Sequence, residues 1–218
     1  GDTFGDTPVG TGPFKFVDWK RSDSITIEKF EDYWQDGLPK LERIIFRYIQ
    51  DNSARLNELM AGSIDLADGI NPSDGASIES NSELQLIERP SMNIGYLGLT
   101  NTRPPFDNKL VRQAVNHAIN KQAIVDAFFG GRAQVAVNPM PPSISGYNDE
   151  ITGYEYNPEK AKELLAEAGY DGAEIELWAM PVARPYMPDG MKVAEVIQKN
   201  LEDVGIPSKI VTYDWAVY

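Results

Sequence analysis

The sequence predicts an α/β protein in two parts, a strand-rich part followed by a part in which helices and strands alternate. Residues 14–49 hold three runs of β-branched and aromatic residues separated by turn residues, a pattern typical of strands. After Arg103-Pro104-Pro105, helical stripes of apolar residues alternate with short strand-like runs. Such alternation favours the α/β class.

Strands are expected to dominate the first ninety residues. The expected strands are Phe14–Trp19, Ile25–Phe30, Leu41–Ile49, Ile64–Ile70 and Leu84–Glu88. The third is almost continuously apolar, which suits a strand covered on both faces. Asp51 or Asn52 can cap a helix that runs to Ala61 and stops at Gly62. The polar connection after Asn71 has room for one helical turn.

A further strand is expected at Asn93–Thr100, with glycines at Gly95 and Gly98. Glycine inside a strand marks a bulge or a close approach of two backbones. Helices are then predicted to start at caps Asp107, Asn120 and Asn157. The remaining elements are a strand at Ala173–Trp178, a helix from near Asp189 to Gly205 and a strand at Ser208–Tyr213.

The stretch Trp178–Pro188, called the arginine loop below, joins the strand at 173–178 to the helix near Asp189. Its three prolines exclude a regular helix or a central strand. It carries one arginine, Arg184, among aromatic and sulfur side chains. A stiff loop with a lone guanidinium suits the capture of a small anion such as a carboxylate. The alternative is a connector whose arginine faces water.

Composition excludes several classes of partner and site. The net charge of −13 and the pI near 4.5 argue against nucleic acid and anionic membranes as partners. With no cysteine, the chain has no disulfide, thiolate metal site or cysteine nucleophile, and it is compatible with cytoplasm or periplasm. The chain starts in the turn-rich Gly1–Gly12 and stops in the apolar Asp214–Tyr218. We therefore expect it to be part of a longer protein.

The sequence contains none of the familiar catalytic or metal-binding motifs. Gly10-Thr11-Gly12-Pro13 lacks the third glycine of a dinucleotide loop. The single histidine, His117, lies beside the apolar stripe of a predicted helix, which favours a structural role over a catalytic one. We predict no catalytic residues, no metal and no cofactor.

Several stretches together resemble one family, and they keep its order along the chain. They are Gly10–Phe14, Glu31–Trp34, Phe106–Ala114, Tyr156–Ala161 with Leu164–Gly169, and Trp178–Pro188. They resemble the peptide/nickel class of periplasmic solute-binding proteins of ABC transporters, solute-binding protein family 5. The run from Trp178 to Tyr186 is similar to the dipeptide-binding branch.

The resemblance implies a periplasmic-binding-protein type II-like architecture, with two lobes around a cleft and mixed sheets flanked by helices. This chain would be an incomplete, central fragment of it. Residues 1–92 would belong to the first lobe and residues 93–218 would form most of the second, truncated at its C-terminal end.

The resemblance also implies site residues. In the dipeptide-binding branch the arginine of the Arg-Pro-Tyr motif pairs with the ligand's C-terminal carboxylate, a role that falls to Arg184. Tyr186 would line the cleft, and Trp178 and Met180 are further candidates for ligand contact. Gly69 and Asn71 become candidates through a looser match to a first-lobe loop. The acidic residue that holds the ligand's amino group would lie beyond Tyr218.

The function implied is a non-enzymatic, monomeric binding protein that delivers dipeptides or short peptides to ABC transporter permease subunits. It would be periplasmic, or a membrane-associated lipoprotein outside the cell in a Gram-positive source. The alternatives are another ligand on the same fold, such as a longer peptide, an opine or a nickel chelate, or a hydrolase domain.

Overall fold

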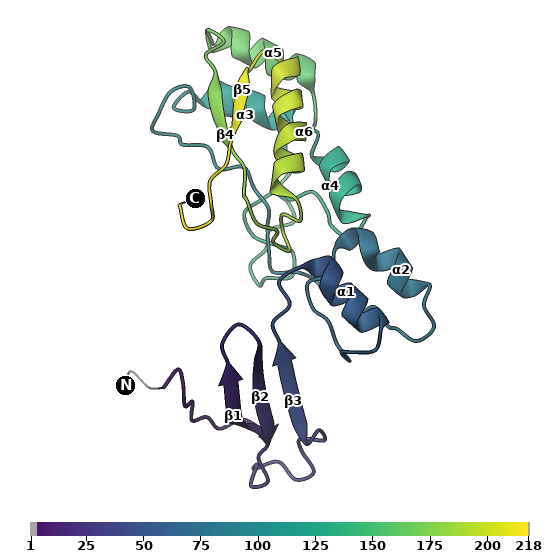
Figure 1. Ribbon diagram of the computed structural model, residues 1–218. Coiled ribbons are helices and arrows are strands. Elements are labelled where there is room, and N and C mark those ends of the chain that lie inside the picture. The colour runs from purple at the N-terminus through teal and green to yellow at the C-terminus, as the bar shows by residue number, and fades with distance from the viewer. Residues whose placement is uncertain (1–3, 218) are drawn as a thin grey trace. The chain divides into compact units, whose positions relative to one another are not determined.

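The computed structural model of the chain describes residues 4–217 (Figure 1). Residues 1–3, at the start of the predicted turn-rich segment, and Tyr218, at the end of the predicted apolar terminus, lie outside the described residues. Internal contacts divide the chain into two compact units, Gly1–Ile70 and Asn71–Tyr218. The predicted lobe boundary after Met92 falls within the second unit, and the assignment of either unit to a lobe stays a prediction.

The first unit contains a three-stranded antiparallel sheet in the order β1-β2-β3. Its strands are β1 (Phe14–Lys20), β2 (Ser24–Lys29) and β3 (Arg43–Arg47), which confirms the three predicted strands, the third in a shorter form. The prediction that β3 is covered on both faces is wrong for this unit, because Ile45 and Phe46 are each 57% exposed. β3 is an edge strand, and its apolar composition could not show what covers it.

One helix follows this sheet. α1 spans Asn52–Met60 and is capped by Asp51, whose carboxylate accepts a hydrogen bond from the backbone N–H of Ala54 at 2.7 Å. Gly62 follows the helix with a φ of 69°, in the left-handed region that glycine adopts without strain. The predicted helix and its stop are confirmed.

Three segments predicted to be strands are not strands in the structure. Residues 64–70, 84–88 and 93–100 pair with none of the strands that the structure describes. Their residues favour extended backbone, but a strand also needs a hydrogen-bonded neighbour, which the local sequence cannot show. The connection after Asn71 is helical, with a 3₁₀ turn η1 (Pro72–Asp74) and a short helix α2 (Gly75–Glu79).

The second unit combines a helical layer with a two-stranded parallel sheet (Figure 1). β4 (Ile175–Trp178) pairs with β5 (Ser208–Val211), and α6 (Gly190–Asp203) connects them. A parallel pair needs such a crossover, because the chain must return to the end of the sheet at which the first strand begins. The other helices are α3 (Lys109–Ala118), α4 (Lys121–Phe129) and α5 (Pro158–Glu167).

Short polar side chains begin these helices. Asn120 and Asn157 cap α4 and α5 as predicted, and Asp189, near which the last helix was expected to begin, caps α6. Each accepts a hydrogen bond from a backbone N–H three residues on, at 2.9–3.0 Å. For α3 the predicted cap, Asp107, is wrong by one position. Asn108 is the cap and accepts from a backbone N–H at 2.9 Å. Aspartate and asparagine cap equally well, so the sequence could not choose between these neighbours.

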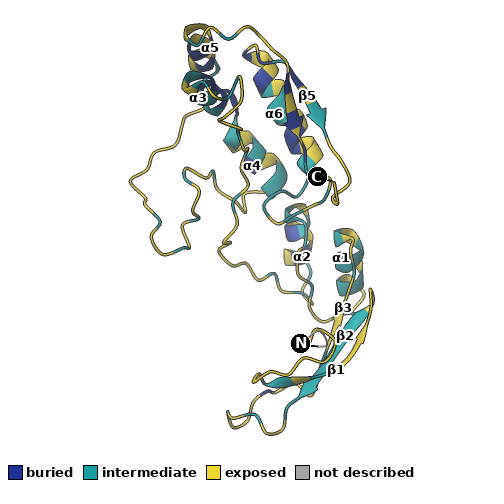
Figure 2. Ribbon diagram, turned by 90° about the vertical axis from the view of Figure 1, so that its left-hand side faces the viewer, coloured by how far each residue is buried: buried dark blue, intermediate teal, exposed yellow. Residues whose placement is uncertain are grey.

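The hydrophobic core of this unit lies where α3, α5 and α6 face one another (Figure 2). Each helix contributes the apolar stripe that its period predicted. The most deeply buried helical members are Ala114 and Ala118 on α3, Ala161 on α5, and Leu201 on α6. The packed helices therefore support β4, β5 and the loop between β4 and α6.

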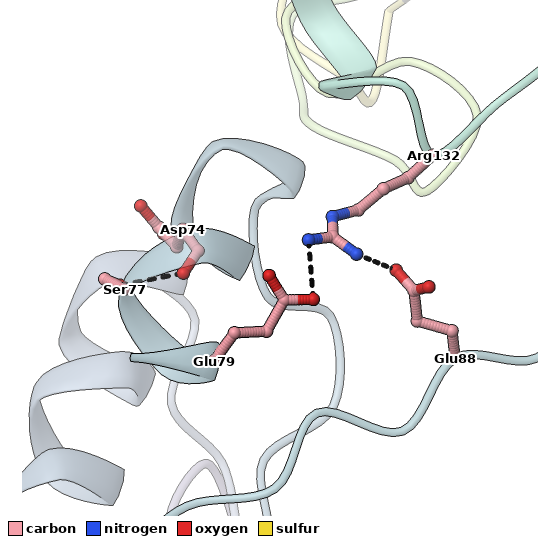
Figure 3. A network of polar contacts seen from close by, with 5 residues as sticks. All are labelled: Asp74, Ser77, Glu79, Glu88 and Arg132. Atoms are coloured by element: carbon pink, nitrogen blue, oxygen red, sulfur yellow. Dashed lines mark hydrogen bonds and ion pairs between the residues drawn. The ribbon is translucent and has the colours of Figure 1, made fainter. Parts of the chain in front are cut away.

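A charged network joins α2 to two later segments of the second unit (Figure 3). The guanidinium of Arg132 donates to Glu79 at 3.0 Å and, through its other terminal nitrogen, to Glu88. The same guanidinium passes directly over Gly75, where a Cβ atom would lie 2.6 Å from Nη2. The hydrogen bonds that Arg132 donates to Glu88 and Glu79 raise the pKa of Arg132, which stays charged.

Candidate functional site

The arginine loop runs from the end of β4 to the cap of α6, and two close contacts shape it. Arg184 and Met187 form an antiparallel bridge in which each backbone N–H donates to the other's carbonyl oxygen at 2.9 Å. At the base of the loop, a Cβ atom on Gly190 would lie 2.5 Å from the carbonyl oxygen of Met180. The bridge and the prolines limit the conformations of the loop, so Arg184 is presented from a preorganised backbone.

The Arg184 side chain is half-buried and has two recorded contacts. Its Nη1 donates to the carbonyl oxygen of Ala183 at 3.1 Å, and its Cζ lies 4.7 Å from the ring centroid of Trp215. Among residues 4–217, no carboxylate forms an ion pair with it. A guanidinium has five N–H donors, so most of the donors of Arg184 are free for an anion.

A groove of about 1060 Å³ lies beside this loop within the second unit. It is lined mainly by the segments 92–100 and 103–106, by β4 and by part of the arginine loop. Three of the predicted site residues line it together, namely Trp178, Met180 and Tyr186. Arg184 is not a lining residue itself, but its Cζ lies over the ring of Trp215, which is one.

Sequence reasoning missed the aromatic residues that follow β5. Trp215 lines the groove and contacts Arg184, and Tyr213 packs on Trp178 with ring centroids 5.1 Å apart. The indole N–H of Trp178 also donates to Glu176 at 3.0 Å. The position of Tyr213 and Trp215 at and beyond the end of a predicted strand could have identified them, because ligands of open α/β sheets bind beyond the carboxyl ends of the strands. Tyr213 and Trp215 occupy that place after β5.

A model of the bacterial extracellular solute-binding proteins, family 5 Middle, matches the chain over residues 1–218. The chain belongs to this family. Heme-binding protein A of Haemophilus influenzae is 42% identical over 218 residues, which are 100% of this chain and 40% of the relative. The dipeptide-binding protein of Escherichia coli is 40% identical over 212 residues, 97% of this chain and 39% of the relative.

A solved relative supports the same membership. It is the ABC transporter-associated periplasmic binding protein DppA of Helicobacter pylori, in complex with the peptide STSA. It is 37% identical with a TM-score of 0.81, and the match covers 97% of this chain and 40% of that one. The type II periplasmic-binding-protein fold predicted from the sequence is thus confirmed. The chain spans about 40% of the length of the relatives it matches.

The two looser candidates, Gly69 and Asn71, fall in different units. Gly69 has a φ of 69°, and its carbonyl oxygen accepts from Arg55 at 3.0 Å. Asn71 precedes η1 and donates through its side chain to Asp74 at 3.1 Å. Asn71 is not a lining residue of the groove. Both therefore have local structural contacts, and their role in binding stays a prediction.

His117 has the surroundings of a structural residue. Its Nδ1 lies 2.9 Å from the carbonyl oxygen of Glu155, and its ring packs edge-on against Tyr154. These contacts fasten the irregular connection before α5 to α3. Within residues 4–217, no cluster of three His, Asp or Glu side chains could hold a metal ion. None of the helices in this range is long and apolar enough to cross a membrane.

Proposed function

We propose that residues 1–218 are the central part of a solute-binding protein that delivers dipeptides or short peptides to the permease subunits of an ABC importer. In this proposal Arg184 binds the ligand's carboxylate, and Trp178, Met180 and Tyr186 contact the rest of the ligand. The observation that carries the proposal is the half-buried guanidinium of Arg184, which has no acidic partner among the described residues and stands beside an aromatic groove.

The relatives support a ligand with a free carboxylate. Their names point to dipeptide, peptide and heme, and each of these molecules carries carboxylates. A bidentate pair between a guanidinium and a carboxylate is strong and directional, and it strengthens when a closing cleft excludes water. A peptide is favoured because its side chains vary, and the groove beside Arg184 offers an adaptable lining of methionine and aromatic residues.

The proposal also covers where the protein works and how it acts. The family is one of extracellular solute-binding proteins, so the whole protein is proposed to work in the periplasm, or as a surface lipoprotein in a Gram-positive source. It would act as a monomer and release its ligand unchanged. Closure of two lobes over the ligand would give the form that the permease recognises.

Calorimetry on the full-length protein tests the proposal with four probes: alanyl-phenylalanine, its C-terminal amide, hemin and nickel with L-histidine. We expect the dipeptide acid to bind and the amide to bind at least about tenfold more weakly, because the amide lacks the charge that pairs with Arg184. Intact dipeptide should be recovered after incubation. Equal affinity for acid and amide, preference for hemin or nickel-histidine, or release of free amino acids would overturn it.

A further inference from the structure

Within the described part of the chain, the ring of Trp215 contacts the Arg184 guanidinium. The 4.7 Å from Cζ to the ring centroid is within the range of a cation–π interaction, about 6 Å. Both residues belong to the second unit, and Trp215 follows β5 at the same end of the sheet from which the arginine loop leaves β4. The two chain segments beyond β4 and β5 therefore meet at this contact.

We propose that Trp215 is a positioning residue that holds the Arg184 guanidinium in the orientation that receives a ligand carboxylate. This inference rests on the carboxylate-binding role proposed for Arg184. A residue acting in this way improves affinity without itself forming the ion pair.

The geometry of the two interactions makes them compatible. Stacking on an indole uses the flat face of the guanidinium, whereas a carboxylate binds in the plane of the guanidinium through its N–H donors. The indole can thus fix the plane while the donors stay free. An arginine side chain is long and flexible, so the conformational entropy that it loses when a ligand orders it opposes binding. Besides the contact with Trp215, the guanidinium is restrained by the hydrogen bond that it donates to the Ala183 carbonyl oxygen.

The exposure of Trp215 argues against a role in the core. Its side chain is 48% exposed, it lines the groove, and it belongs to neither of the two hydrophobic clusters. Replacing it should leave the packing of α3, α5 and α6 unchanged. An effect on ligand binding would then report on Arg184 and on the groove.

The test compares Trp215→Leu and Trp215→Phe in the full-length protein, with the dipeptide acid and its amide as probes. Trp215→Leu should weaken binding of the acid by about three- to thirtyfold, the range of one cation–π contact, and leave the amide nearly unaffected. Trp215→Phe keeps an aromatic face and should restore most of the loss. Trp34→Leu is the matched control, because Trp34 is a 74% exposed tryptophan of the first unit, and it should change neither affinity.

Two further measurements separate the possible failures. In Arg184→Ala, the added substitution Trp215→Leu should have little further effect, and additive losses would overturn the inference. Equal losses for acid and amide would also overturn it. In the NMR spectrum of the ligand-free protein, the Arg184 Nε–H signal should show an aromatic ring-current shift. The signal is assigned by its loss in Arg184→Lys, so this measurement needs no Trp215 variant. Absence of that shift would overturn the inference alone, whereas a shift without any peptide binding would overturn the proposed function and this inference with it.

Discussion

A Cβ atom on Gly95 would lie 2.6 Å from the backbone carbonyl oxygen of Tyr186. Real Cβ atoms do not approach an oxygen so closely, so glycine is what lets residues 93–100 pass against the arginine loop. The predicted close approach is thereby confirmed at one of the two glycines of this segment. At Gly98 the nearest atom would be 3.9 Å away, which is an ordinary contact.

Gly95→Ala should displace the arginine loop or the segment beneath it. We expect the full-length protein to lose about 1–3 kcal/mol of stability, as for other overpacked sites, and to bind its ligand more weakly. Urea unfolding and calorimetry measure the two effects. Gly98→Ala is the matched control and should stay within about 0.5 kcal/mol of the parent. Identical unfolding midpoints for the two variants would show that the loop yields without strain.

Asp189 caps α6 at the end of the arginine loop. Its carboxylate accepts from the Lys192 backbone N–H at 3.0 Å and pairs with the Lys192 ammonium at 3.0 Å. Asp189→Ala should therefore destabilise the protein by about 1 kcal/mol in thermal or urea unfolding. Asp203→Ala, at the opposite end of the same helix, removes an exposed ion pair but no cap, and its effect should be smaller.

The contribution of Asp189 should also depend on pH. Burial alone raises its pKa, but the hydrogen bonds from Lys192 and the charge of Lys192 outweigh it, so the pKa lies below the ordinary 3.8. A lowered folded-state pKa means that the stabilisation is complete above the unfolded value and is lost as the pH falls through the folded value. The stability difference between the parent and Asp189→Asn should thus shrink below about pH 4. A difference that stays constant down to pH 2 would contradict this assignment.

The network around Arg132 should make the second unit sensitive to salt. Arg132→Gln leaves the carboxylates of Glu79 and Glu88 without their shared cation, so the melting temperature should fall. The fall should diminish in 1 M NaCl, which screens charges at the surface. Arg89→Gln, at an exposed position one residue after Glu88, is the matched control. If both substitutions change the melting temperature alike, the network is not a stabilising unit.

Sequence reasoning succeeded where a structure depends on neighbours in the chain. Asn157 with Pro158 specifies a helix start by local hydrogen bonding and a fixed φ, and the stripe from Val111 to Ala118 specifies which face is buried. It failed at residues 93–100, because their composition shows a tendency to extend but not the presence of a partner strand. The prediction that β3 is covered on both faces failed for the same reason, since burial depends on the whole fold and not on the strand's own sequence.

In the candidate site, too, local features could be predicted from the sequence and long-range contacts could not. Arg184 could be singled out because the prolines and the lone cation stand together in the sequence. The contact between Trp215 and Arg184 could not be predicted, because it joins segments on either side of α6 and depends on the parallel pairing of β4 with β5. Trp178 was chosen through the resemblance, and its tilted ring contact with Tyr213 arises from that same pairing.

The guanidinium of Arg184 should account for most of the preference for a free carboxylate. Arg184→Ala in the full-length protein should weaken dipeptide binding by roughly 2–5 kcal/mol, as when one partner of a buried charged pair is removed. Arg184→Lys should recover only part of this, because an ammonium cannot pair bidentately. Arg103→Ala is the matched comparison, since Arg103 lines the groove directly and is exposed. A larger loss in Arg103→Ala than in Arg184→Ala, measured by calorimetry, would transfer the carboxylate role to Arg103 and remove it from the arginine loop.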